Sequence, residues 1–139
     1  MPKIHPSPFL RYALLGDAVA SGAMGLLSLG GAGLLAAPLG LPEMLLRMTG
    51  LILVPYAAAV AWLGTRPVAS ASRWAVWAVI AANVMWVVDS AILLLAGWVS
   101  PTSLGTAFVI LQAVVVAGFA EAQFIGIRRA ERPMTPALA

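Results

Sequence analysis

Residues 74–99 read WAVWAVIAANVMWVVDSAILLLAGWV, a long apolar stretch that only Asn83, Asp89 and Ser90 strongly interrupt. A transmembrane helix needs about 20 predominantly apolar residues, so this stretch predicts a helix that crosses a bilayer. Asp89 then lies near the hydrocarbon centre, where an unpaired charge costs at least ~2.5–3.5 kcal/mol on the insertion scale. A carboxylate at that depth needs a partner or a purpose, which makes Asp89 the first candidate for a functional residue.

The composition of the whole chain agrees with a membrane environment. Its 139 residues are 62% hydrophobic and only 9% charged, with a mean hydropathy of +0.98. Soluble domains carry about 25% charged residues, so this chain has too few charges to cover a surface in water. We therefore predict an all-α integral membrane protein whose four transmembrane helices use nearly the whole chain.

Several classes of function are excluded by the residue types present. The net charge of +3 comes from basic residues at predicted helix ends and not from a basic patch mixed with aromatic residues, so no nucleic-acid partner is expected. Cysteine is absent and His5 is the single histidine, which excludes disulfides, thiolate sites and a haem held by intramembrane histidines. No nucleophile–base pair is recognisable. We expect no metal or cofactor, and the sequence favours a non-enzymatic protein.

Proline, glycine and arginine residues divide the chain. Residues 1–8 hold three prolines and form a predicted tail, and residues 129–139 form a second one. The transmembrane domain then covers residues 9–128, with helices at about 9–36, 42–63, 72–99 and 102–128. A cleaved signal peptide is an alternative for the first helix. Its apolar stretch, residues 12–37, is longer than the ~7–15 residues of a signal sequence, so we expect a retained helix.

The basic residues predict the orientation. They flank the first helix, the loop between the second and third helices, and the end of the fourth helix: Lys3, Arg11, Arg66, Arg73, Arg128, Arg129 and Arg132. Because cytoplasmic loops are enriched in Lys and Arg, we expect an up-down-up-down bundle in a bacterial cytoplasmic (inner) membrane, with both termini in the cytoplasm. Arg47 is the one basic residue on the opposite side.

Sequence position along each helix gives an approximate depth, since the rise is ~1.5 Å per residue. Asp89, Arg47 and Gln112 fall in one layer displaced toward the outside. Arg47 is therefore a candidate partner for Asp89, because a guanidinium can bind a carboxylate through two parallel hydrogen bonds. Glu43 competes for Arg47, since it lies one helical turn earlier on the same predicted helix.

A second polar layer lies nearer the cytoplasm and contains Asp17, Glu121, Asn83 and Tyr56. Arg11 is within reach of the two carboxylates of this layer. Asn83, Trp86 and Ser90 recur on one helical face, which must point into the bundle or toward a partner because lipid offers no hydrogen bonds.

Structural roles compete with functional ones at these positions. Asn83, Gln112 and Gln123 are typical of hydrogen bonds between transmembrane helices, at about 0.6 kcal/mol each. An Asp89–Arg47 pair is at least as consistent with fixing helix register as with a site. Asp17 and Glu121 suit either near-interface groups reached by water or a proton path. Trp86 is more often a packed ring than a ligand platform.

Three functions remain open. Faces of small residues on the first and fourth predicted helices, among them Gly118, Ala122 and Gly126, allow close helix contacts. They favour an interaction or accessory bundle that self-associates or joins a larger membrane complex. The second possibility is a binder or proton-coupled transporter of a small lipophilic or ionic ligand at an Asp89/Arg47 site, and the third is an enzyme acting on a lipophilic substrate. A solid core without a cavity beside Asp89 would remove the last two.

Overall fold

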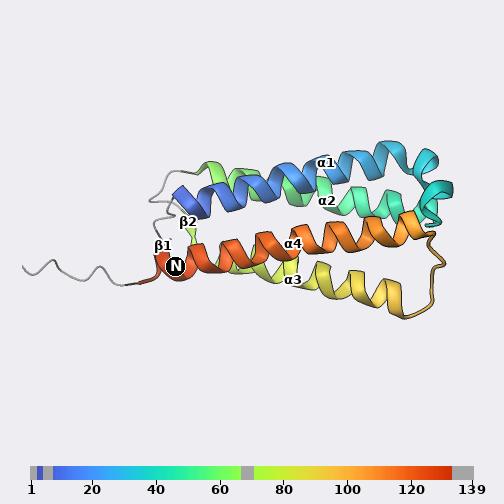
Figure 1. The fold of residues 1–139 in the computed structure, drawn as a ribbon. Coiled ribbons are helices and arrows are strands. Elements are labelled where there is room, and N and C mark those ends of the chain that lie inside the picture. The colour runs from blue at the N-terminus through green and yellow to red at the C-terminus, as the bar shows by residue number, and fades with distance from the viewer. Residues whose placement is uncertain (1–2, 5–7, 67–70, 133–139) are drawn as a thin grey trace, which may run out of the picture.

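Four long helices make up nearly all of the structure, a computed structural model that describes residues 3–4, 8–66 and 71–132. The helices are α1 (Pro8–Leu39), α2 (Glu43–Thr65), α3 (Arg73–Leu95) and α4 (Ser103–Ala130). They run alternately in opposite directions along one bundle (Figure 1). Two strands of two residues, β1 (Lys3–Ile4) and β2 (Ala71–Ser72), pair antiparallel at one end. The predicted all-helical architecture is therefore confirmed.

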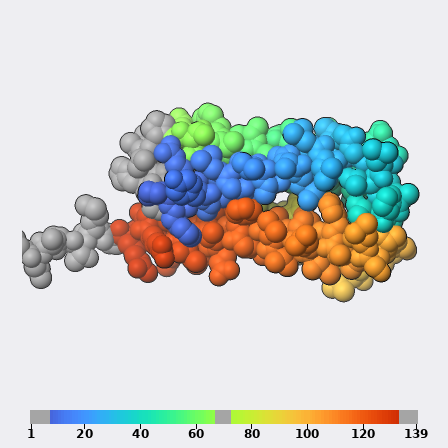
Figure 2. All heavy atoms as spheres, turned by 45° about the horizontal axis from the view of Figure 1, so that its top comes forward, coloured from blue at the N-terminus to red at the C-terminus, as the bar shows by residue number. Residues whose placement is uncertain are grey.

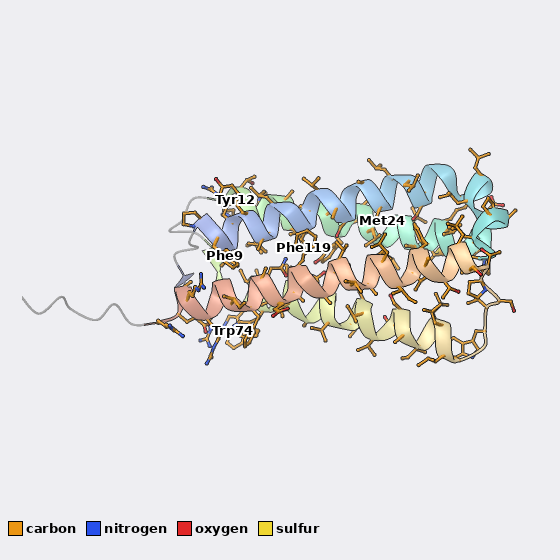
Figure 3. All side chains as sticks on the ribbon, in the orientation of Figure 1. Phe9, Tyr12, Met24, Trp74 and Phe119 are labelled. Carbon is orange, nitrogen blue, oxygen red and sulfur yellow. The ribbon has the colours of Figure 1, made fainter. Side chains whose placement is uncertain are left out.

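Each of the four helices is long and apolar enough to cross a membrane. Large apolar side chains point outward along the bundle, and Leu34 and Leu95 are 84% and 86% exposed. Exposed aromatic rings gather at the end where the chain starts, among them Phe9, Tyr12 and Trp74 (Figure 3). An apolar outer surface with aromatic residues toward one end is typical of a protein whose solvent is lipid.

The turn regions explain where α3 and α4 begin and end. α3 stops at Leu95, before the predicted end at residue 99. Gly97 has a φ of +75°, a left-handed conformation that a right-handed helix cannot contain. Thr102 caps α4, because its hydroxyl oxygen accepts a hydrogen bond of 3.1 Å from the backbone N–H of Gly105. The Thr102 hydroxyl also donates to the carbonyl oxygen of Pro38 at 2.7 Å, which ties α4 to the end of α1.

Glycine residues set the close contacts between helices. A Cβ atom on Gly50 of α2 would lie 2.7 Å from the carbonyl oxygen of Gly25 on α1. A Cβ on Gly126 of α4 would lie 2.9 Å from Cβ of Leu10 on α1. Gly118, on the same predicted small-residue face as Gly126, has open space where a side chain would be. Only part of that face therefore closes the bundle.

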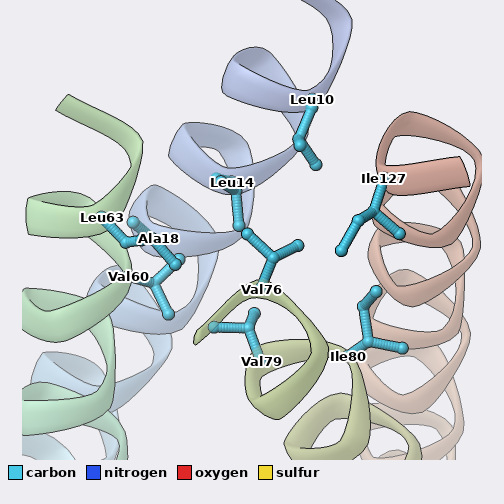
Figure 4. Packing of buried hydrophobic residues seen from close by; sticks show 9 residues of the cluster. All are labelled: Leu10, Leu14, Ala18, Val60, Leu63, Val76, Val79, Ile80 and Ile127. Carbon is cyan, nitrogen blue, oxygen red and sulfur yellow. The ribbon is translucent and has the colours of Figure 1, made fainter. Parts of the chain in front are cut away.

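The apolar core is divided into two clusters. The larger one lies toward the end that holds the chain start and packs all four helices together (Figure 4): Leu10, Leu14, Ala18, Val60, Leu63, Val76, Val79, Ile80 and Ile127. The smaller one lies toward the opposite end: Ala32, Leu39, Leu41, Leu46 and Val109. Helix α1 packs along α2, and α4 packs against both α1 and α3, whereas the backbones of α2 and α3 come close at few positions and meet mainly through side chains. The middle of the bundle is consequently left for polar groups and open space.

Arginine side chains hold the end where the chain starts. Arg11 donates to the carbonyl oxygens of Gly64 and Arg66, at 3.0 and 3.2 Å, and so satisfies the end of α2. The sequence placed Arg11 within reach of Asp17 and Glu121, but these carbonyls occupy it instead. Arg73 forms an ion pair with Glu131. These contacts are typical of helix ends, where unpaired carbonyl groups attract cations.

Candidate functional site

Asp17 is the centre of a buried polar cluster that joins all four helices. Its side chain on α1 is fully buried. Oδ1 accepts a hydrogen bond from the hydroxyl of Ser21 at 3.0 Å, one turn along the same helix. Oδ2 accepts from the hydroxyl of Tyr56 on α2 at 2.9 Å, the amide of Asn83 on α3 at 2.8 Å and the amide of Gln123 on α4 at 2.8 Å. One carboxylate thus receives a donor from every helix of the bundle.

These donors compensate Asp17 for the loss of water. Within the described residues Asp17 forms no ion pair with a cationic side chain, so hydrogen bonds alone solvate the carboxylate. Hydrogen bonds to a charged acceptor are about twice as strong as neutral ones. Asn83 also donates to Oε1 of Gln123 at 3.0 Å, which fixes the two amides relative to each other. The cluster therefore fixes both the register and the rotation of the helices.

The hydroxyl of Tyr56 lies between two acceptors. Its oxygen is 2.9 Å from Oδ2 of Asp17 and 2.8 Å from Oδ1 of Asn83. A hydroxyl carries one hydrogen, so it can donate to only one of these oxygens at a time. The Tyr56 hydroxyl therefore links α2 either to Asp17 on α1 or to Asn83 on α3, according to which oxygen accepts its hydrogen.

A second polar group links α3 and α4 farther along the bundle. The indole N–H of Trp86 donates to Oε1 of Gln112 at 2.6 Å. The Gln112 amide donates in turn to the hydroxyl oxygen of Ser90 at 3.1 Å, and that hydroxyl donates to the backbone carbonyl of Trp86 at 2.8 Å. Gln112 thus acts as the interhelical hydrogen-bonding residue that the sequence suggested, and Trp86 is its partner.

A cavity of about 470 Å³ lies between the two polar groups. It is lined from all four helices, mostly by apolar side chains, and Asp17, Tyr56 and Asn83 face it from one end. Met24 of α1 and Phe119 of α4, both labelled in Figure 3, lie on its wall. The space-filling view shows a hollow between α1 and α4 at this level (Figure 2). Apolar pockets of ~300–1,000 Å³ with a few polar groups are typical of small-molecule sites.

A second cavity, of about 370 Å³, continues toward the opposite end of the bundle. Five residues line both cavities: Met24, Trp86, Asp89, Phe108 and Gln112. The two spaces therefore adjoin at the level of Trp86 and Asp89. Several lining residues are exposed on the outer surface of the bundle, among them Ile52, Ala82 and Met85. The first cavity therefore reaches the outer surface of the bundle at these residues.

Asp89 does not pair with Arg47, in contrast to the expectation from depth. Arg47 forms its ion pair with Glu43, one turn earlier on α2. Glu43 is the partner because it lies one turn from Arg47 on the same helix surface, whereas the backbones of α2 and α3 come close at few positions. Asp89 is exposed on α3 and, within the described residues, accepts no hydrogen bond and forms no ion pair. A void does lie beside it, since it lines both cavities.

The structure brings together some predicted site residues and separates others. Asp17, Asn83 and Tyr56 of the inner layer meet in the cluster, whereas Glu121 is exposed on α4 and lines neither cavity. The depth of Glu121 predicted that it would join this layer, but Gln123 of the same helix contacts Asp17 instead. Two residues along a helix correspond to a rotation of ~200°, so Glu121 and Gln123 cannot both face inward. Ser21 was not among the residues expected at the site, although its position one turn after Asp17 on the same helix was a signal for this hydrogen bond.

Comparison with protein-family models, with curated proteins and with solved structures finds no match to this chain. Its function is therefore inferred from the geometry of the site alone.

Proposed function

We propose that the protein binds a small lipophilic molecule in the cavity between its four helices. The observation that carries the proposal is the apolar cavity of about 470 Å³ in the middle of the bundle, with polar side chains at its end. Apolar walls suit a ligand that partitions into the membrane, and a few fixed polar groups orient it. The exposed lining residues Ile52, Ala82 and Met85 are consistent with entry from the lipid.

The cavity also favours this function over a purely accessory role. An interaction bundle needs a packed core and a docking face, and its stability falls with every unfilled space in the core. Here the two apolar clusters lie toward the ends, and the middle of the bundle is left open. A carrier, a transporter and an enzyme on a lipophilic substrate must each bind a lipophilic molecule. Binding is the step that these alternatives share, and the cavity supports this step.

The test fills the cavity with a larger side chain. Ala20 of α1 lines the cavity, whereas Ala23, one turn later on the same helix, is exposed and does not line it. The Ala20→Trp variant is compared with Ala23→Trp and with the unmodified protein in lipid nanodiscs. Each sample is irradiated with a neutral, lipophilic aryl diazirine, and mass spectrometry locates the labelled residues.

We expect saturable labelling of cavity residues such as Met24 and Phe119. The Ala20→Trp variant should lose it and the Ala23→Trp variant should keep it. Labelling confined to the outer faces of the helices, or equal labelling in both variants, would show that the cavity does not take up the probe.

The proposal includes an orientation in a bacterial cytoplasmic membrane, with both termini in the cytoplasm. Arg11, Arg73, Arg128 and Arg129 belong to the end of the bundle where the chain starts, as the distribution of positive charge in membrane proteins favours for the cytoplasmic side. Because the chain has no cysteine, single cysteines report accessibility directly. A membrane-impermeant maleimide should label Ser100→Cys in intact cells, and Arg132→Cys only after permeabilisation. The reverse pattern would invert the topology.

A further inference from the structure

We infer that the ligand of the central cavity is a lipophilic organic cation, whose positive charge binds the carboxylate of Asp89. The inference rests on the proposed function and specifies the chemical class of its ligand. Asp89 lines both cavities at the level where they adjoin, so a molecule that occupies this shared part of the two spaces lies beside its side chain.

The first observation is that Asp89 lacks a partner within the described residues. The structure records no hydrogen bond and no ion pair for this carboxylate there, and Arg47 is paired with Glu43. An unpaired carboxylate within a membrane-spanning helix is costly, because lipid offers it neither water nor a counter-charge. A bound cation would remove that cost, and this difference in free energy would become available for binding.

The second observation is the sign of the charge around the cavities. Among the residues that the structure describes, neither cavity is lined by an Arg or a Lys, and the charged side chains that line them are Asp17 and Asp89. Asp17 already accepts hydrogen bonds from Ser21, Tyr56, Asn83 and Gln123. Asp89 is the carboxylate left for a ligand, and among the described residues no cationic side chain lines the cavities to pair with an anion.

The third observation is the chemistry of the remaining wall. Trp86 lies one turn before Asp89 on α3 and also lines both cavities. An indole ring attracts a cation placed over its face, and Met24 and Phe108 supply apolar surface around it. A carboxylate beside an aromatic ring within apolar walls selects a ligand with a delocalised or alkylated cationic group and a hydrophobic body.

The experiment compares two probes of similar shape and opposite charge. Tetraphenylphosphonium is a lipophilic cation, and tetraphenylborate is the matching anion. Equilibrium binding of each is measured with the protein in nanodiscs, and empty nanodiscs give the partition into lipid. We expect saturable binding of tetraphenylphosphonium to the protein and none of tetraphenylborate. Equal binding of both probes would overturn the inference.

Substitutions locate the charge that is responsible. Asp89→Asn should weaken tetraphenylphosphonium binding by at least about tenfold, because it removes one partner of a desolvated charge pair. Asp89→Glu keeps the charge and should retain binding. Glu121→Gln is the matched control, because Glu121 is an exposed carboxylate on α4 that lines neither cavity. Unchanged binding in Asp89→Asn would overturn the inference, as would an equal loss in Glu121→Gln.

The outcomes separate the inference from the proposed function. If the neutral diazirine labels the cavity and Asp89→Asn leaves tetraphenylphosphonium binding unchanged, the ligand is neutral. In that case only the inference fails. If neither probe enters the cavity, both fail. If Asp89→Asn instead changes the oligomeric state and leaves cation binding unchanged, Asp89 contacts a second copy of the chain, which also overturns the inference.

Discussion

Gln123 on α4 donates a 2.8 Å hydrogen bond to Oδ2 of Asp17 on α1, across 106 residues of sequence. The contact joins the first helix to the last, and Asn83 and Tyr56 bring the other two helices to the same oxygen atom. A buried carboxylate with four donors is thus the point at which the whole bundle is aligned. The central cavity begins beside this cluster, so the fold and the proposed binding site depend on the same residues.

Asp17→Ala should destabilise the bundle. The substitution leaves the donors of Tyr56, Asn83 and Gln123 without their common acceptor in the buried interior of the bundle. Leaving a buried polar group unsatisfied costs about 1–3 kcal/mol. The free energy of unfolding in mixed micelles, measured by titration with a denaturing detergent, should fall by at least that amount. Glu121→Ala is the control and should stay within about 0.5 kcal/mol of the unmodified protein, since Glu121 is exposed.

Tyr56→Phe should have a smaller effect. The variant keeps the ring and removes the hydroxyl, whose single hydrogen is shared between Asp17 and Asn83. Hydrogen bonds within membranes contribute about 0.6 kcal/mol on average, so we expect a loss of roughly that size in the same unfolding titration. A loss as large as that of Asp17→Ala would mean that Tyr56, and not the carboxylate, aligns the helices.

Gly126→Leu and Gly118→Leu should behave differently although both lie on α4. The side chain added at Gly126 meets Leu10, because a Cβ there already lies 2.9 Å from the Cβ of Leu10. Overpacking of this kind typically costs about 1–3 kcal/mol. Gly118 faces open space and should tolerate leucine without loss of monomer stability. Thermal unfolding in detergent tests this difference, and size-exclusion chromatography with light scattering shows whether Gly118→Leu disturbs self-association.

Asp89→Asn should not destabilise the ligand-free protein. A structural ion pair with Arg47 would predict a loss, but the structure pairs Arg47 with Glu43 and leaves Asp89 without a protein partner among the described residues. Removing an unpaired charge from the membrane-spanning part lowers the cost of insertion. The unfolding titration should therefore show equal or higher stability. A clear loss of stability would reveal a structural role for the carboxylate.

The predicted depth of polar residues along the helices identified several residues that meet in the buried cluster around Asp17. Asp17, Asn83 and Tyr56 were placed in one layer from the rise per residue, and they meet in the cluster. Depth does not determine which way a side chain faces, because that depends on the rotation of each helix. Glu121 lies at a suitable depth but points outward, and Gln123 points inward. The same limit explains the wrong pairing of Asp89 with Arg47.

The sequence by itself determined that the helices suit a lipid environment and that there are four of them among the described residues. Its long apolar stretches cannot be covered with charge in water, and prolines and glycines separate them into four segments that can each cross a membrane. Only the tertiary structure decided that Asp17 is the carboxylate that receives hydrogen bonds from the protein, and that Asp89 has no protein partner among the described residues. The physical reason is that an apolar helix face has a similar free energy against lipid and against another helix. The rotation of each helix therefore follows from close glycine contacts and from hydrogen bonds between distant segments. Those contacts bury Asp17, leave a cavity in the middle of the bundle and place Asp89 on its wall.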